Sequence, residues 1–167
     1  MQARTLAALA TGLASVFVIT SRAPAQKASG LDDPTIVAIF DAANTADIET
    51  GQLAAKRGST QEVRDFGAML ARDHKMVRTQ GRDLAAKLGV TPTPPKPDAG
   101  AKAHAEAMKK LSSLSGKAFD HAFLQHEVAF HKSVIDAVTS TLLPAIRNAG
   151  FVNCSNDFFA IPAAVSR

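Results

Sequence analysis

The sequence predicts an all-α protein folded as a helical bundle, and three observations support this. Apolar residues recur at intervals of three and four through four segments of the chain. Four prolines between residues 91 and 97 divide these segments into two pairs. No stretch shows the alternation with Val, Ile and Thr enrichment that is typical of a strand. We therefore expect one domain of four helices, over residues 32–146.

The first 25 residues have the pattern of a secretory signal peptide. Arg4 gives a positive start, residues 6–19 are mainly apolar, and Ala23-Pro24-Ala25 supplies the small residues of a cleavage site. The apolar run is shorter than the roughly 20 residues that span a bilayer, which favours a cleaved signal over a retained membrane anchor. We expect cleavage after Ala25 and a linker at 26–31. The mature protein, without a transmembrane segment, is then periplasmic or otherwise exported to the cell envelope.

Charge and composition argue against nucleic acid as a partner. The formal net charge is +4, and it falls to +2 on removal of residues 1–25, which contain Arg4, Arg22 and no acidic residue. The chain has no Trp or Tyr for base stacking and no basic run longer than two residues. Cys154 is the only cysteine, so no disulfide forms within the chain, and its thiol is either free or paired between chains.

The first two helices have clear start and stop signals. Asp32-Asp33-Pro34 is typical of a helix start, and the first helix is expected to run to about Lys56 and to close at Gly58. Ser59 and Glu62 have the spacing of a capping box for the second helix, which continues to about residue 88 before Gly89.

The second pair of helices follows the proline-rich crossing. One helix is expected from about Ala99 to Leu114 and the next from Lys117 to about Leu142. From Phe151 onward no helical period is evident, so residues 147–167 are expected to form an atypical tail.

Three polar residues occupy positions where a purely structural helix would carry Leu. They are His74 in the second helix, and Glu127 and His131 in the fourth. Glu127 and His131 are four residues apart and so share a helix face. Two helices could thus direct imidazole and carboxylate groups into one bundle interior, which is how metal sites in bundles are built.

Further carboxylates extend this candidate metal site. Asp120 lies seven residues before Glu127 and points the same way, whereas Asp47 and Glu49 flank the apolar stripe of the first helix. This donor set suits iron, manganese, zinc or copper. Two alternatives remain open. His74 could be a hydrogen-bonded histidine at the core edge, and Glu127 with His131 could be an intrahelical pair in a buried network that sets helix register.

Enzymatic activity has less support. Di-iron bundles carry Glu-x-x-His on two helices, and here Ala71 and Val128 stand three residues before His74 and His131. The sequence also lacks a nucleophile elbow, a P-loop, a Rossmann glycine pattern and a His-Glu-x-x-His motif. An oxidase is therefore the third-ranked hypothesis, after a metal-binding protein and a structural or interaction protein of the envelope.

Several sequence segments together resemble a ferritin-like family of exported bacterial proteins of unknown function, often labelled as predicted outer membrane proteins. The most specific are Asp73-His74, the phrase from Leu114 to Asp120, and His131 one helix later. The resemblance also includes residues 47–54 and 63–67 and covers about 33–146. It implies a ferritin-like four-helix bundle with inward-facing histidines. We accordingly expect an exported bundle with a stress-related or storage role.

One departure from this family concerns the end of the chain. Its members carry a further helix ending in His after the Leu-Pro segment, whereas this chain turns at Gly150 into Phe-rich sequence without another histidine. A truncation, a frameshift and a lineage-specific ending all fit this pattern. An incompletely covered bundle would expose an apolar groove, with self-association or poor stability as the expected consequence.

Overall fold

A computed structural model describes residues 31–152, and every regular element in this range is helical. The signal peptide, the linker up to residue 30 and Cys154 lie outside the described residues. The elements are α1 (Asp33–Arg57), α2 (Gln61–Lys87), α3 (Ala99–Ser112), α4 (Gly116–Ala137), the π-helix η1 (Val138–Leu142) and α5 (Leu143–Ala145). The prediction of an all-α protein is confirmed.

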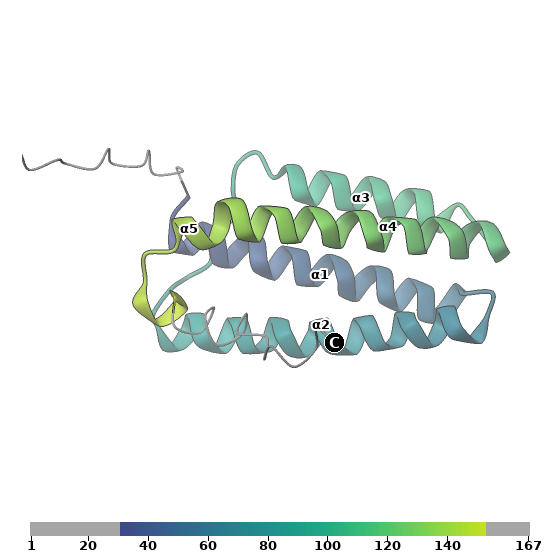
Figure 1. The fold of residues 1–167 in the computed structure, drawn as a ribbon, viewed down its shortest axis with the longest axis horizontal. Coiled ribbons are helices and arrows are strands. Elements are labelled where there is room, and N and C mark those ends of the chain that lie inside the picture. The colour runs from purple at the N-terminus through teal and green to yellow at the C-terminus, as the bar shows by residue number, and fades with distance from the viewer. Residues whose placement is uncertain (1–30, 153–167) are drawn as a thin grey trace, which may run out of the picture.

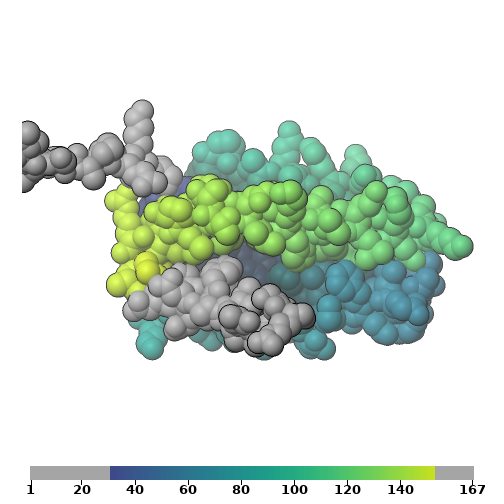
Figure 2. Space-filling model, in the orientation of Figure 1, coloured from purple at the N-terminus to yellow at the C-terminus, as the bar shows by residue number. Residues whose placement is uncertain are grey.

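The four long helices lie side by side, and α1 is central (Figure 1). Successive long helices alternate in direction (Figure 1). The α2–α3 connection, like the two shorter ones, joins helix ends that lie at the same end of the bundle. Figure 2 shows α1 recessed between α4 and α2 on the face in view. None of the helices between residues 31 and 152 combines the length and apolar character needed to cross a bilayer.

The start of α1 agrees with the prediction, whereas the start of α2 is displaced by one residue. Asp32 caps α1, since its Oδ1 accepts a hydrogen bond from the backbone N–H of Thr35 at 2.9 Å. At α2 the capping residue is Thr60 and not Ser59. Ser59 is unavailable because its backbone N–H donates to Asp120 Oδ1 at 2.8 Å and its hydroxyl donates to Asp120 Oδ2.

Two glycines bring α1 and α2 into backbone contact. A Cβ atom on Gly67 would lie 2.6 Å from both Ala55 N and Gly51 O, and one on Gly51 would lie 2.7 Å from Gly67 O. These distances are too short for any side chain, and a backbone atom cannot move aside as a flexible side chain can. The contact therefore fixes how α1 and α2 are aligned along their lengths.

The apolar core lies near the end of the bundle where α1 turns into α2. Phe119 and Phe123 of α4 are fully buried, their rings 6.1 Å apart, and Phe66 of α2 approaches Phe123 at 5.8 Å. Leu111 joins them from α3 and Ala54 from α1. Burial of each large side chain contributes about 1.5–3 kcal/mol, so this cluster holds α4 against the α1–α2 pair.

The chain beyond α4 turns back toward the start of α1. The fourth helix begins one residue earlier than predicted, and its expected last turn is the π-helix η1. The Asp33 carboxylate then accepts hydrogen bonds from the backbone N–H groups of Arg147 and Asn148, at 2.9 and 3.0 Å. Residues 149–152 are helical, so the prediction that helical structure is lost from Phe151 is wrong for the two described residues of that segment. Asn148 explains this turn, because its side chain accepts from the N–H of Gly150 and its carbonyl from that of Phe151.

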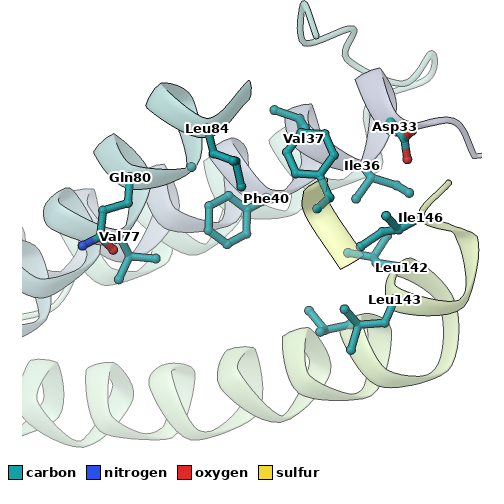
Figure 3. A pocket seen from close by; sticks show the side chains of 13 residues that line it. Asp33, Ile36, Val37, Phe40, Val77, Gln80, Leu84, Leu142, Leu143 and Ile146 are labelled. Atoms are coloured by element: carbon teal, nitrogen blue, oxygen red, sulfur yellow. The ribbon is translucent and has the colours of Figure 1, made fainter. Parts of the chain in front are cut away.

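An apolar cavity of about 200 Å³ lies at this end of the bundle (Figure 3). Leu142, Leu143 and Ile146 face side chains of α1 and α2 across it, among them Phe40 and Leu84. Phe40 lies against Gly81, where a Cβ atom would come within 2.5 Å of its ring. This cavity is separate from the polar residues described next.

Candidate metal site

Three helices bring Asp47, His74 and His131 together in the bundle interior. Asp47 comes from α1, His74 from α2 and His131 from α4, and one potential ligand atom from each lies within 4.8 Å of the others. Asp47 Oδ2 is 3.2 Å from His74 Nδ1, and the two imidazole rings meet edge to face with their centroids 5.6 Å apart. Two imidazoles and one carboxylate thus converge on one point.

Asn44 fixes the orientation of His74. Its Nδ2 donates to the carbonyl of Phe40 at 2.8 Å, which assigns Oδ1 as the acceptor of the 3.0 Å hydrogen bond with His74 Nδ1. Nδ1 of the neutral ring therefore carries the proton, and Nε2 keeps its lone pair. Asn44 Oδ1 and Asp47 Oδ2, at 3.0 and 3.2 Å, both face this Nδ1–H group, so a metal would bind His74 at Nε2.

His131 is oriented in the same way. Its Nδ1 is 2.9 Å from the carbonyl oxygen of Glu127, one turn earlier in α4. A carbonyl oxygen only accepts, so Nδ1 is the protonated nitrogen and Nε2 of this ring also keeps its lone pair. Both histidines are thus held as potential ligands.

The carboxylates beside the histidines are buried and incompletely hydrogen-bonded. Asp47 and Glu127 are each 4% exposed. When both carboxyl groups are ionised, Asp47 Oδ1 and both oxygens of Glu127 have no hydrogen-bond partner among the described residues, whereas a proton on Asp47 is shared with Glu127. The Thr50 hydroxyl donates to the backbone carbonyls of Ala46 and Asp47, at 3.1 and 3.3 Å, and also favours the ionised form of Glu127. Buried, unpartnered carboxylate oxygens are costly unless a cation or a proton compensates them.

Burial also shifts the protonation of this cluster. It raises the pKa of Asp47 to about 7, a shift that His131 opposes and Glu127 reinforces. It likewise raises the pKa of the Glu127 carboxyl. Burial and the nearby His131 lower the pKa of His74, which favours the neutral imidazole that binds metals.

A cavity of about 420 Å³ adjoins the cluster between α2 and α4. His74, Glu127 and His131 contribute to its wall, whereas Asp47 does not. Most of the remaining wall is apolar, and at its rim the Met69 and Val128 side chains are 41% and 74% exposed. The cluster is therefore closed on the α1 side and accessible between α2 and α4.

The structure places Glu49 and Asp120, two other residues of the expected site, outside this cluster. Glu49 Oε2 is 2.7 Å from His104 Nε2, on the side of α1 that faces α3. Asp120 binds Ser59 at the α1–α2 turn. Glu127 is adjacent to the cluster, with Oε2 3.6 Å from His131 Nδ1, but it is not one of the three converging residues. Asn44 is the residue that the sequence analysis missed.

This geometry defines the class of the protein: it is all-helical and carries a histidine–carboxylate cluster in its interior. The chain belongs to the family described as a domain of unknown function (DUF4142), whose model matches residues 19–151. The resemblance to a family of unknown function is thereby confirmed. Neither the curated proteins nor the solved structures give a significant match to the chain.

Proposed function

We propose that this protein binds one transition-metal ion through Asp47, His74 and His131. The observation that carries the proposal is the convergence of one ligand atom from each residue within 4.8 Å. Two imidazoles and one carboxylate form a donor set used for non-haem iron(II), and a similar set binds catalytic zinc. Iron, manganese, zinc and copper are therefore the metals to test.

The unpartnered oxygens favour this proposal over a hydrogen-bonded network without metal. A network that only sets helix register is stable when its members satisfy one another. Here Asp47 and Glu127 can satisfy one another only by sharing a proton, and in their ionised forms Asp47 Oδ1 and both oxygens of Glu127 have no hydrogen-bond partner among residues 31–152. A divalent cation would compensate the charge of Asp47 and use its free oxygen, which explains why burial of this carboxylate is tolerated.

The proposal includes a setting for the protein. The signal-peptide pattern in residues 1–25 supports an exported, cell-envelope location, where a bundle could sequester or store a metal under stress. We propose that the similarity to ferritin-like proteins lies in the interior carboxylate–imidazole site and not in the helix connections. The alternating helix directions match a simple up-and-down bundle, whereas ferritin-like bundles contain one long crossover.

The experiment is elemental analysis of untagged protein purified from the periplasm, before and after reconstitution with each of the four metals. We expect near-stoichiometric metal in the native protein and its loss in His74→Ala and His131→Ala. His121→Ala is the matched control, because His121 is exposed on α4 and outside the cluster. Chelation should lower the melting temperature of the native protein and leave the two site variants unchanged. Metal-free protein with chelator-insensitive melting after all four reconstitutions would instead support an interaction bundle.

A further inference from the structure

The direction in which the proposed metal site is open follows from the cavity beside it. Three protein ligands leave at least one coordination position free on a tetrahedral or larger centre. The two histidines line the cavity of about 420 Å³ and Asp47 does not, so Asp47 lies behind the metal position as seen from the cavity. The free position therefore faces the space between α2 and α4.

Glu127 is the buried acidic side chain in the wall of this cavity. It is 4% exposed, and its Oε2 is 3.6 Å from His131 Nδ1. Metal-free Asp47 can share a proton with Glu127, but once a metal holds Asp47 as a carboxylate, neither Glu127 oxygen has a hydrogen-bond partner among the described residues. The other acidic residue of the wall, Asp73, is already paired with Arg72 at 2.8 Å. A molecule that enters the cavity thus meets an unsatisfied hydrogen-bond acceptor next to the open side of the metal.

The two features together define a class of ligand. A lone pair is needed for the metal, and an O–H or N–H group is needed for the Glu127 acceptor. Most of the remaining wall is apolar, with Phe66, Leu70 and Val128 among its residues, so the metal and Glu127 are the two neighbouring polar contacts, and a small molecule can make both. An aprotic anion satisfies the metal but leaves Glu127 unpartnered and is repelled by its charge when Glu127 is ionised.

We propose that the metal site takes a small protic molecule from this cavity, of the class of hydrogen peroxide or hydroxylamine, with Glu127 accepting its hydrogen bond. This inference rests on the proposed metal site. It assigns to Glu127 the selection of the incoming ligand, and it assigns coordination of the metal to the three converging residues alone.

The test uses full-length mature protein loaded with cobalt(II), whose visible absorption reports ligand exchange. Hydroxylamine is the protic probe and azide is the aprotic probe. Replacement of Glu127 by Leu should weaken hydroxylamine binding about tenfold or more while azide binding stays equal or tightens. Glu127→Gln should retain hydroxylamine binding, because its amide oxygen still accepts. Both Glu127 variants should keep stoichiometric cobalt.

A second pair of variants tests the route. Val128→Trp at the cavity rim should reduce binding of both probes, whereas Ile135→Trp, two turns further along the exposed side of α4 and outside the cavity lining, should not. Loss of cobalt in both Glu127 variants would make Glu127 a ligand and overturn the inference, as would equal weakening of the two probes in Glu127→Leu. If the unaltered protein binds no metal, the proposed function fails first, and that outcome is distinguishable from metal-loaded protein that binds neither probe.

Discussion

Asn44 Oδ1 accepts a hydrogen bond from His74 Nδ1 at 3.0 Å, and this contact joins α1 to α2 directly beside the proposed metal position. The bond selects the tautomer in which Nε2 is free to bind, so Asn44 is expected to act on affinity through the histidine. Replacing Asn44 by Ala should weaken metal binding about 10- to 100-fold. Asn44→Asp keeps an acceptor oxygen at this position and should retain most of the affinity. Competition with a chromophoric chelator measures both, and equal affinity in Asn44→Ala and the unaltered protein would contradict this role.

The raised pKa of Asp47 predicts how the stability of the metal-free protein depends on pH. Its pKa is about 7 in the folded protein against 3.8 for an ordinary aspartate carboxyl, so between these values the folded state binds the proton that the unfolded state releases. The free energy of unfolding therefore falls as pH rises from about 4 to about 7, by up to a few kcal/mol. Glu127, whose pKa is also raised, acts in the same direction. His74, whose pKa is lowered, opposes them below about 6.5.

Chemical denaturation of metal-free protein across this pH range, compared with Asp47→Asn, isolates the contribution of Asp47 because the other groups are shared. We expect a shallower fall in the variant and a higher stability than the unaltered protein at neutral pH. Parallel curves for the two proteins would refute the assignment.

The glycine contact between α1 and α2 predicts a large effect from a small substitution. Gly67→Ala places a methyl group 2.6 Å from backbone atoms of Gly51 and Ala55, so the helices must separate. The cost should be about 1–3 kcal/mol in the free energy of unfolding. Metal affinity should fall with it, because the Asp47–His74 spacing depends on the same helix pair. Gly100→Ala is the matched control, since the nearest atom is 3.5 Å away and a helical alanine is favoured by up to about 1 kcal/mol. A neutral Gly67→Ala would mean that α1 and α2 are not in backbone contact.

Asp120 has a structural role, in contrast to Asp47, which is the carboxylate of the proposed metal site. It accepts hydrogen bonds from the backbone and hydroxyl of Ser59, and these bonds hold its pKa below the usual range. Asp120→Ala should lower the melting temperature, because the α1–α2 turn loses its tie to α4, but should leave the metal content unchanged. Asp65→Ala is a suitable comparison, as this exposed carboxylate on α2 accepts a hydrogen bond from the side chain of Gln61, one turn earlier in the same helix. Loss of metal in Asp120→Ala without loss of structure would show that Asp120 contributes to the metal site.

The helices and most of the cluster could be predicted from the sequence because both depend on the phase of a helix. His74 and His131 interrupt apolar stripes, which is sufficient to place them toward the interior. The choice between Asp47 and Glu49 could not be made in this way. Both flank the stripe of α1, and only the positions of the neighbouring helices show that Asp47 lies near α2 and α4 while Glu49 faces α3.

Other features depended on contacts that no local pattern reveals. Asp120 is on the same face of α4 as Glu127, yet it lies two turns away, at the α1–α2 turn, where Ser59 is its partner. That same contact displaced the expected cap of α2 from Ser59 to Thr60. Asn44 precedes Asp47 by one turn and could have been suspected from that spacing alone. Its significance comes from a histidine thirty positions later in the chain.

The origin of the three converging residues on α1, α2 and α4 has a consequence for how the site comes into existence. Residues 47 and 74 meet once the first helical hairpin forms, but residue 131 arrives only after the chain has passed through α3 and returned. Closing such distant segments is entropically costly and tends to occur late in folding. A fully assembled metal position should therefore be absent from hairpin-like intermediates. The rate of metal uptake during refolding would then report the rate at which α4 docks.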